Sequence, residues 1–239
     1  MIYTEDIRVR YSEVGEDGIL TPTAIVNYLQ DITMIHSQTL AGEHDILKEE
    51  DECWVLSAWQ IDILKDIESF EKIKLCTSPY DFKGPMGLRN CWLESMDGEK
   101  LVVANSFWTY IDIKKMMPKK VSKEVVARYE PLCEKIEMEY EPRKIKIPDM
   151  VEKRPPIDVK YSQIDTNHHV NNCQYVATAL EVLGLKERVR RIRTEYKKSA
   201  VLGDVFYPYV NEENGKYVVD LRDSEGVSYA VIEFITDLA

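Results

Sequence analysis

Residues 7–14 read Ile-Arg-Val-Arg-Tyr-Ser-Glu-Val, and residues 157–164 read Ile-Asp-Val-Lys-Tyr-Ser-Gln-Ile. The two octapeptides lie 150 residues apart in a chain of 239 residues, and four of their positions are identical. Segments of the same kind follow each copy, which indicates an internal duplication. Two similar units that converged independently are the alternative, and the Val-x-Tyr-Ser tag at the same place in both units argues against it.

A helix is expected soon after each copy. Thr21-Pro22 is a helix-start signal, with Thr as the N-cap and Pro at the first helical position. Apolar residues then recur at helical spacing over residues 23–40, and Ala41-Gly42 ends the run. In the second half, Asn171-Asn172 precedes a similar apolar stripe over residues 173–183.

Each helix is followed by a run of expected strands separated by turn signals such as Asp97-Gly98 and Asn214-Gly215. This order predicts an α+β fold built from two units, each a long central helix wrapped by a twisted antiparallel sheet. Five prolines among many charges over residues 131–156 predict a linker at the surface. The domains expected are therefore 1–130, a linker 131–156, and 157–239. The strands are expected near 54–63, 71–80, 87–95, 100–113, 189–199, 204–210, 216–222 and 227–236.

Composition and charge narrow the function classes. The formal net charge of −11 argues against nucleic acid as a partner, because such binding depends on cationic neutralisation of phosphates. No apolar run approaches the roughly 18 residues of a membrane helix, and the N-terminus lacks the apolar core of a signal peptide. The five cysteines are irregularly spaced without a CxxC pair, which favours reduced thiols. A soluble, cytoplasmic protein is expected.

The two copies differ most in residues 165–172, Asp-Thr-Asn-His-His-Val-Asn-Asn, where the first copy has neither Asn nor His. If this segment is extended, Asp165, Asn167 and His169 face one side and His168 faces away. The following helix would direct its free N–H groups at nearby negative charge. A carboxylate, an amide, an imidazole and a helix N-terminus together can orient water and stabilise an oxyanion.

Each of these residues also has a purely structural interpretation. Asp165 is a good turn residue, and asparagines commonly cap helices or form turns. His168 is expected to be solvated. Their combination next to a helix start favours a site in the second half, with a substrate-shaping role for the first half.

The pattern Tyr161-Ser-x-Ile-Asp-x-Asn-x-His-Val-Asn-Asn-x-x-Tyr175 resembles the signature of acyl-acyl-carrier-protein (acyl-ACP) thioesterases. Trp54-Val-Leu, Ile61-Asp-Ile and Asp97-Gly98-Glu extend the resemblance into the first half. It implies two tandem hotdog folds and hydrolysis of fatty acyl-ACP to free fatty acid and carrier protein, in fatty acid biosynthesis. It also implies catalytic roles for Asp165, Asn167 and His169, without a metal or cofactor. Asp165 could act as a general base or as a nucleophile that forms an anhydride, and the sequence leaves both roles open.

The sequence departs from that family after Glu195-Tyr196-Lys197-Lys198. A catalytic Glu and a neighbouring Cys follow this tag in the family, whereas Ser199 and Ala200 follow it here. On an alternating strand Ser199 shares a face with Glu195, so both are additional candidates for the site. Cys173 is an alternative nucleophile near His169, although a Cys on a central helix usually fills the core.

The implied partner is an acyl carrier protein whose phosphopantetheine carries the acyl chain, and neither nucleic acid nor membrane insertion is expected. A homodimer is a further option. Because carrier proteins are acidic, docking requires local positive charge, and residues 186–198 are rich in bases. A solvated strand face explains these bases equally well. The candidates are Arg188, Arg190, Arg191, Arg193, Lys197 and Lys198.

Two other functions remain open. An acyl-CoA thioesterase would use the same site and differ only in the carrier. A non-catalytic acyl-binding protein would explain the missing Glu. A hotdog dehydratase is disfavoured, because the Asp-x-Asn-x-His order followed by Val-Asn-Asn is typical of thioesterases.

Overall fold

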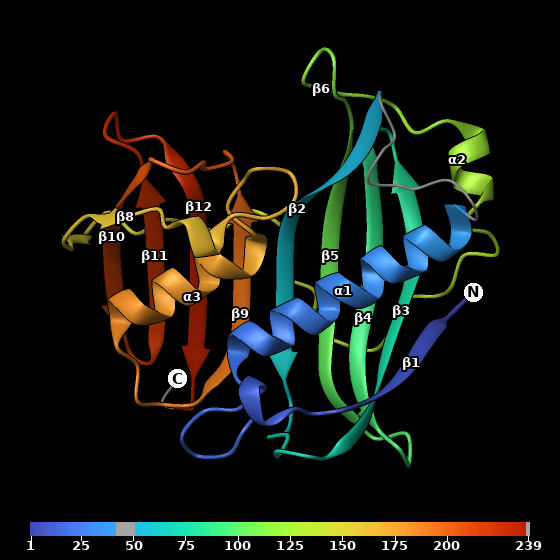
Figure 1. Cartoon of the computed structure of the whole chain (residues 1–239), viewed down its shortest axis with the longest axis horizontal. Coiled ribbons are helices and arrows are strands. Elements are labelled where there is room, and N and C mark those ends of the chain that lie inside the picture. The colour runs from blue at the N-terminus through green and yellow to red at the C-terminus, as the bar shows by residue number, and fades with distance from the viewer. Residues whose placement is uncertain (42–50, 238–239) are drawn as a thin grey trace. The chain divides into compact units, whose positions relative to one another are not determined.

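The computed structural model describes residues 1–41 and 51–237, which divide into two compact units. Unit 1 comprises residues 1–57 and 63–140, and unit 2 comprises residues 58–62 and 141–239. Within the described residues, each unit contains one long helix and an antiparallel sheet (Figure 1).

In unit 1 the strand order is β1-β3-β4-β5-β2, and helix α1 packs against β1, β3 and β4. Thr21 caps α1 as predicted, because its hydroxyl accepts a hydrogen bond from the Ala24 amide at 3.2 Å. Gly42, the predicted stop, lies outside the described residues, and α1 ends at Ala41. The elements are β1 (Tyr3–Arg8), α1 (Pro22–Ala41), β2 (Glu52–Ile63), β3 (Lys72–Lys83), β4 (Met86–Ser95), β5 (Lys100–Asp112), β6 (Met117–Pro118) and α2 (Lys123–Ala127).

In unit 2, residues 58–62 of β2 pair with β9, and the order continues β9-β12-β11-β10-β7. Asn171 caps helix α3 by accepting from the Cys173 amide at 3.0 Å, and Gly184 ends it in the left-handed conformation. The elements are β7 (Glu152–Lys153), β8 (Ile157–Asp158), α3 (Asn172–Leu183), β9 (Val189–Tyr196), β10 (Val205–Glu213), β11 (Lys216–Arg222) and β12 (Ser228–Thr236).

The expected helices and the eight expected strands are confirmed, but three strands end three residues away from the predicted position. Strand β3 ends later, at Lys83, and β10 ends later, at Glu213. Strand β9 ends at Tyr196, three residues earlier than predicted. The five cysteines, all within the described residues, are unbridged, and three of them are buried. No helix in the described part of the chain is long and apolar enough to cross a membrane.

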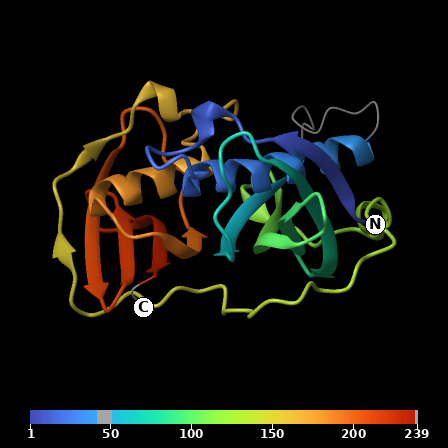
Figure 2. The same ribbon diagram turned by 90° about the horizontal axis from the view of Figure 1, so that it is seen from below.

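The proline-rich segment packs closely on both units. Residues 131–140 follow the face of the unit 1 sheet opposite α1 (Figure 2). There the Ile136 amide donates to Asn90 Oδ1 at 3.3 Å. Residues 141–147 follow the face of the unit 2 sheet opposite α3, and Ile145 is fully buried against Val218 and Val231. The segment therefore contributes to the core of both units.

Candidate active site

The segment that holds the candidate residues Asp165, Asn167 and His169 forms a tight turn, which we call the motif turn, so the prediction of an extended segment with alternating faces is wrong. Ile164 and Val170 form an antiparallel bridge, and the Asp165 amide donates to the His169 carbonyl at 2.8 Å. The His168 amide donates to the Asp165 carbonyl at 3.1 Å, and His168 has a φ of 62°. The turn nevertheless gathers Asp165, Asn167 and His169 within five residues.

Asp165 organises this turn through one of its carboxylate oxygens. Oδ1 accepts from the Asn167 amide at 2.8 Å and from the His169 amide at 3.4 Å. Among the described residues, Oδ2 accepts no hydrogen bond. Asp165 therefore acts as a turn residue through Oδ1, as its structural interpretation predicts. Its Oδ2 remains available for chemistry.

Exposure differs along the turn. Asn167 and His168 are exposed, whereas Asp165 and His169 are half-buried. Helix α3 begins three residues after His169, and its first-turn residue Cys173 is buried. Burial of Cys173 agrees with its interpretation as core filling.

The first copy of the repeat has the same backbone without the chemistry. The Gly15 amide donates to the Ile19 carbonyl at 2.9 Å, and the Gly18 amide donates to the Gly15 carbonyl at 3.0 Å. Gly18 has a φ of 76°, so it corresponds to His168 in conformation as well as in position. The first copy therefore carries Gly15, Asp17 and Ile19 at the positions where the second copy carries Asp165, Asn167 and His169.

Ser199 lies beside the motif turn but outside the strand. The Val170 amide donates to the Ala200 carbonyl at 2.8 Å, which brings Ser199 next to the end of the turn. Ser199 is exposed and lies three residues beyond the end of β9. The prediction that it shares a strand face with Glu195 is therefore wrong.

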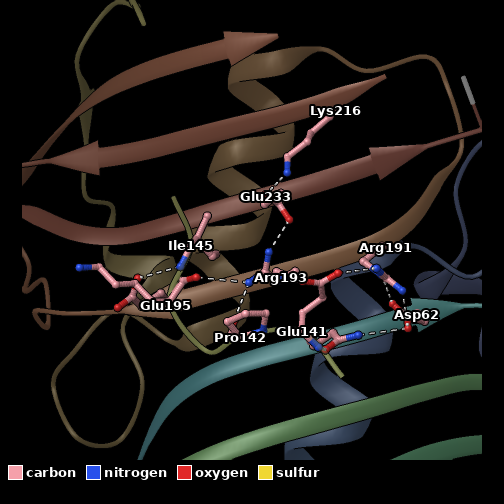
Figure 3. A network of polar contacts seen from close by, with 11 residues as sticks. Asp62, Glu141, Pro142, Ile145, Arg191, Arg193, Glu195, Lys216 and Glu233 are labelled. Atoms are coloured by element: carbon pink, nitrogen blue, oxygen red, sulfur yellow. Dashed lines mark hydrogen bonds and ion pairs between the residues drawn. The ribbon is translucent and has the colours of Figure 1, made fainter. Parts of the chain in front are cut away.

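Glu195 faces away from α3. The neighbouring Tyr196 hydroxyl donates to the Asn172 carbonyl at the start of α3, so the alternation of a strand turns Glu195 to the other face. There its Oε2 accepts from the Ile145 amide at 3.3 Å (Figure 3). Glu195 therefore serves the packing of residues 141–147, and the alternative in which it reaches the motif is wrong.

Tyr175 has a role in the site that the sequence pattern did not predict. Its hydroxyl accepts from the Ala200 amide at 2.9 Å, and burial raises its pKa to about 12. Tyr175 thus holds residues 199–200 against the motif turn. The equivalent residue in the first copy is Ile25, and this difference between the copies is the signal that could have identified it.

Three arginines of the expected basic patch are held in ion pairs with acidic side chains. Arg193 is buried and bonds to Glu233 at 2.8 Å and to the Pro142 carbonyl at 2.5 Å (Figure 3). Arg191 pairs with Asp62 and Arg190 with Asp237. Because Arg193 is buried, its assignment to a carrier surface is wrong. Arg190 and Arg191 lie on opposite faces of the strand and each is paired with a carboxylate, so they offer little net charge to a partner.

Comparison with known proteins identifies the family. The sequence model of the acyl-ACP thioesterase N-terminal domain matches residues 1–129, and that of the C-terminal domain matches residues 148–234. A palmitoyl-acyl carrier protein thioesterase of Arabidopsis thaliana is 24% identical over 83% of this chain and 52% of its own length. An oleoyl-acyl carrier protein thioesterase of the same plant is 26% identical over 85% and 62%. The chain spans about half the length of the curated relatives it matches.

Solved structures confirm the tandem hotdog fold. An acyl-ACP thioesterase from Bacteroides thetaiotaomicron superposes with a TM-score of 0.89 at 23% identity, covering 99% of this chain and 98% of that one. A 12:0-ACP thioesterase from Umbellularia californica gives 0.82 at 16% identity, covering 98% and 96%. Since both domain models of the family match and together span most of the sequence, this chain belongs to the acyl-ACP thioesterase family.

Proposed function

We propose that this protein hydrolyses fatty acyl-ACP to a free fatty acid and carrier protein. The observation that carries the proposal is the repeat itself. Two copies of one backbone turn occur in the chain, and only the second holds a carboxylate, an amide and an imidazole at the start of a helix. Family membership supports the thioester substrate and the carrier.

In the proposed reaction, water attacks the carbonyl carbon of the thioester and the carbon–sulfur bond breaks. Asp165 acts as the general base through Oδ2 and takes a proton from the attacking water, and that proton then passes to the departing thiolate sulfur. Asn167 and His169 orient the water or the carbonyl. The N-terminus of α3 favours the negative charge that develops on the carbonyl oxygen.

Asp165 carries the carboxylate chemistry alone in this proposal. Ser199 stands where the family has its Glu, and a hydroxyl is not a base near neutral pH. Glu195 faces residues 141–147. We assign to the first half of the chain the role of determining which acyl chains are preferred.

The test uses Asp165→Asn, because the Asn side-chain oxygen can still accept the two amide hydrogen bonds that close the turn. The variant should remain folded, while kcat on acyl-ACP falls by about 10² or more, the usual scale for loss of a general base. Asp17→Asn is the matched control. Asp17 Oδ1 accepts from the Ile19 amide at 3.0 Å in the first copy, so this change should leave kcat unaltered.

Thiol release is measured with acyl-ACP and acyl-CoA of several chain lengths. Equal or greater kcat/KM on acyl-CoA would favour an acyl-CoA thioesterase. Binding of acyl-ACP without thiol release would favour a non-catalytic acyl-binding protein. An equal loss of activity in Asp17→Asn and Asp165→Asn would remove the motif turn from the mechanism.

A further inference from the structure

Three apolar side chains are exposed beside the motif turn. Tyr161 is 81% exposed, Leu202 is 55% exposed and Val201 is 42% exposed. Both ends of the segment 200–204 are bonded to the chain that flanks the turn. The Val170 amide donates to the Ala200 carbonyl at 2.8 Å, and the Val159 amide donates to the Asp204 carbonyl at 2.9 Å. We name the surface formed by Lys160, Tyr161, Val201 and Leu202 the turn-side surface.

Unit 1 contains a second version of this surface on the same backbone. The Leu20 amide donates to the Ile67 carbonyl at 2.8 Å, and the Val9 amide donates to the Glu71 carbonyl at 3.0 Å. The Glu68 amide donates to the Glu71 carboxylate at 3.1 Å, as the Val201 amide donates to the Asp204 carboxylate at 2.9 Å. Glu68 therefore corresponds to Val201, and Ser69 to Leu202.

The two versions differ in charge. The first, residues 10–20 with 67–71, has one base and five acids. The second, residues 160–170 with 200–204, has one base and two acids, and one of these is the catalytic candidate Asp165. Glu13, Glu16, Asp17 and Glu68 of the first version are replaced by Gln163, Thr166, Asn167 and Val201 in the second. Of these four acids Glu16, Asp17 and Glu68 are exposed, so the second version lacks three exposed acids that the first carries, in a chain of net charge −11.

We propose that the turn-side surface is the docking surface for the acidic acyl carrier protein, a proposal that rests on the proposed function. Because the second version carries fewer acidic side chains than the first, an acidic partner meets less electrostatic repulsion there. An exposed aromatic ring and two aliphatic side chains supply apolar area of the kind enriched at the centre of interfaces. Lys160 contributes positive charge at the edge. A carrier seated here places its prosthetic arm beside Asp165 and His169.

The repeat supplies the variants that test this surface. Val201→Glu introduces the residue that unit 1 holds at the same backbone position, and Leu202→Ser does the same with Ser69. The fold should therefore accept both changes, which circular dichroism and thermal unfolding check. Each change should raise KM for acyl-ACP by about 10-fold, with kcat little altered, because the charge and the contact act before the chemical step. Glu68→Val in unit 1 is the matched control and should leave KM unchanged.

Two further measurements separate docking from chemistry. An acyl-pantetheine thioester, which lacks the protein part of the carrier, should show the same kcat/KM in Val201→Glu as in the unaltered chain. Binding of acyl-ACP is measured directly in the Asp165→Asn background, so that the result does not depend on turnover. There Val201→Glu should weaken binding by the same factor as it raises KM.

Unchanged binding of acyl-ACP in Val201→Glu and Leu202→Ser overturns the docking proposal. An equal loss on acyl-pantetheine also overturns it, because the surface would then act on the site and not on the carrier. The failure of the proposed function looks different: neither thioester is hydrolysed by the unaltered chain, whatever the binding result.

Discussion

At the scale of single residues, His168 shows how the second copy of the repeat departs from an ideal turn. Its φ of 62° lies in the left-handed region, where the first copy has Gly18 at 76°. A side chain in that region costs roughly 1–2 kcal/mol because its Cβ approaches the carbonyl oxygen. His168 therefore occupies a position at which glycine is the favoured residue.

His168→Gly should raise the free energy of unfolding by about 1 kcal/mol and leave kcat nearly unchanged, because the exposed imidazole makes no contact that closes the turn. Urea denaturation and the acyl-ACP assay measure the two effects. His169→Ala is the comparison, and its kcat should fall by about 10². A loss of kcat in His168→Gly as large as that in His169→Ala would show that His168 takes part in the reaction.

At the scale of elements, β9 carries different functions on its two faces. Tyr196 faces α3, whereas Arg193 and Glu195 face residues 141–147 and hold them through the Pro142 carbonyl and the Ile145 amide (Figure 3). Glu233 is 3% exposed and bonds to Arg193 and Lys216, each at 2.8 Å. This buried network joins the chain segment between the repeats to the sheet of unit 2.

Arg193→Ala should lower the free energy of unfolding by about 3 kcal/mol or more, because it leaves the buried Glu233 carboxylate with a weakened set of partners. Arg190→Ala is the matched control on the same strand. Arg190 pairs with Asp237 at the surface, where an ion pair contributes less than about 1 kcal/mol. Chemical denaturation measures both, and equal losses would show that the network under residues 141–147 adds no stability.

At the scale of the whole molecule, stability depends on a buried arginine–histidine pair in the core of unit 1. The Arg89 guanidinium is buried and donates to His36 Nδ1 at 2.8 Å and to the Thr77 hydroxyl at 3.0 Å. The His36 ring stacks on Tyr3 with centroids 5.1 Å apart. Burial and the neighbouring Arg89 charge lower the pKa of His36 to about 4. His36 is therefore a neutral acceptor in the folded protein at neutral pH.

This lowered pKa makes stability depend on pH. An unfolded histidine takes up a proton near pH 6.5, whereas His36 in the folded protein resists it until about pH 4. The contribution of His36 to the free energy of unfolding is fully present above pH 6.5. It falls as the pH drops from 6.5 towards 4, and it changes no further below pH 4. The loss should not exceed about 3 kcal/mol. His36→Gln keeps an acceptor for Arg89 and should remove this part of the pH profile, as denaturation at pH 4.5 and pH 7 would show. An identical profile in the variant would exclude His36 as its origin.

The sequence by itself determined the repeat, both long helices and the eight main strands. These features depend on local signals, such as the Thr21 and Asn171 caps and the Asn-Gly and Asp-Gly turns, which act over a few residues. It also indicated the candidate site residues, because Asp165, Asn167 and His169 stand where the first copy has Gly15, Asp17 and Ile19.

Only the tertiary structure decided how these residues are arranged. The Ile164–Val170 bridge and the bond from Val170 to Ala200 close a turn where the pattern alone allowed an extended strand. Packing of residues 141–147 decided that Arg193 and Glu195 belong to a buried network and not to a carrier surface or the site. Periodicity reports which residues share a face, but the partner that covers the face comes from a distant part of the chain. That pairing depends on contacts between segments far apart in sequence, to which no local pattern is sensitive.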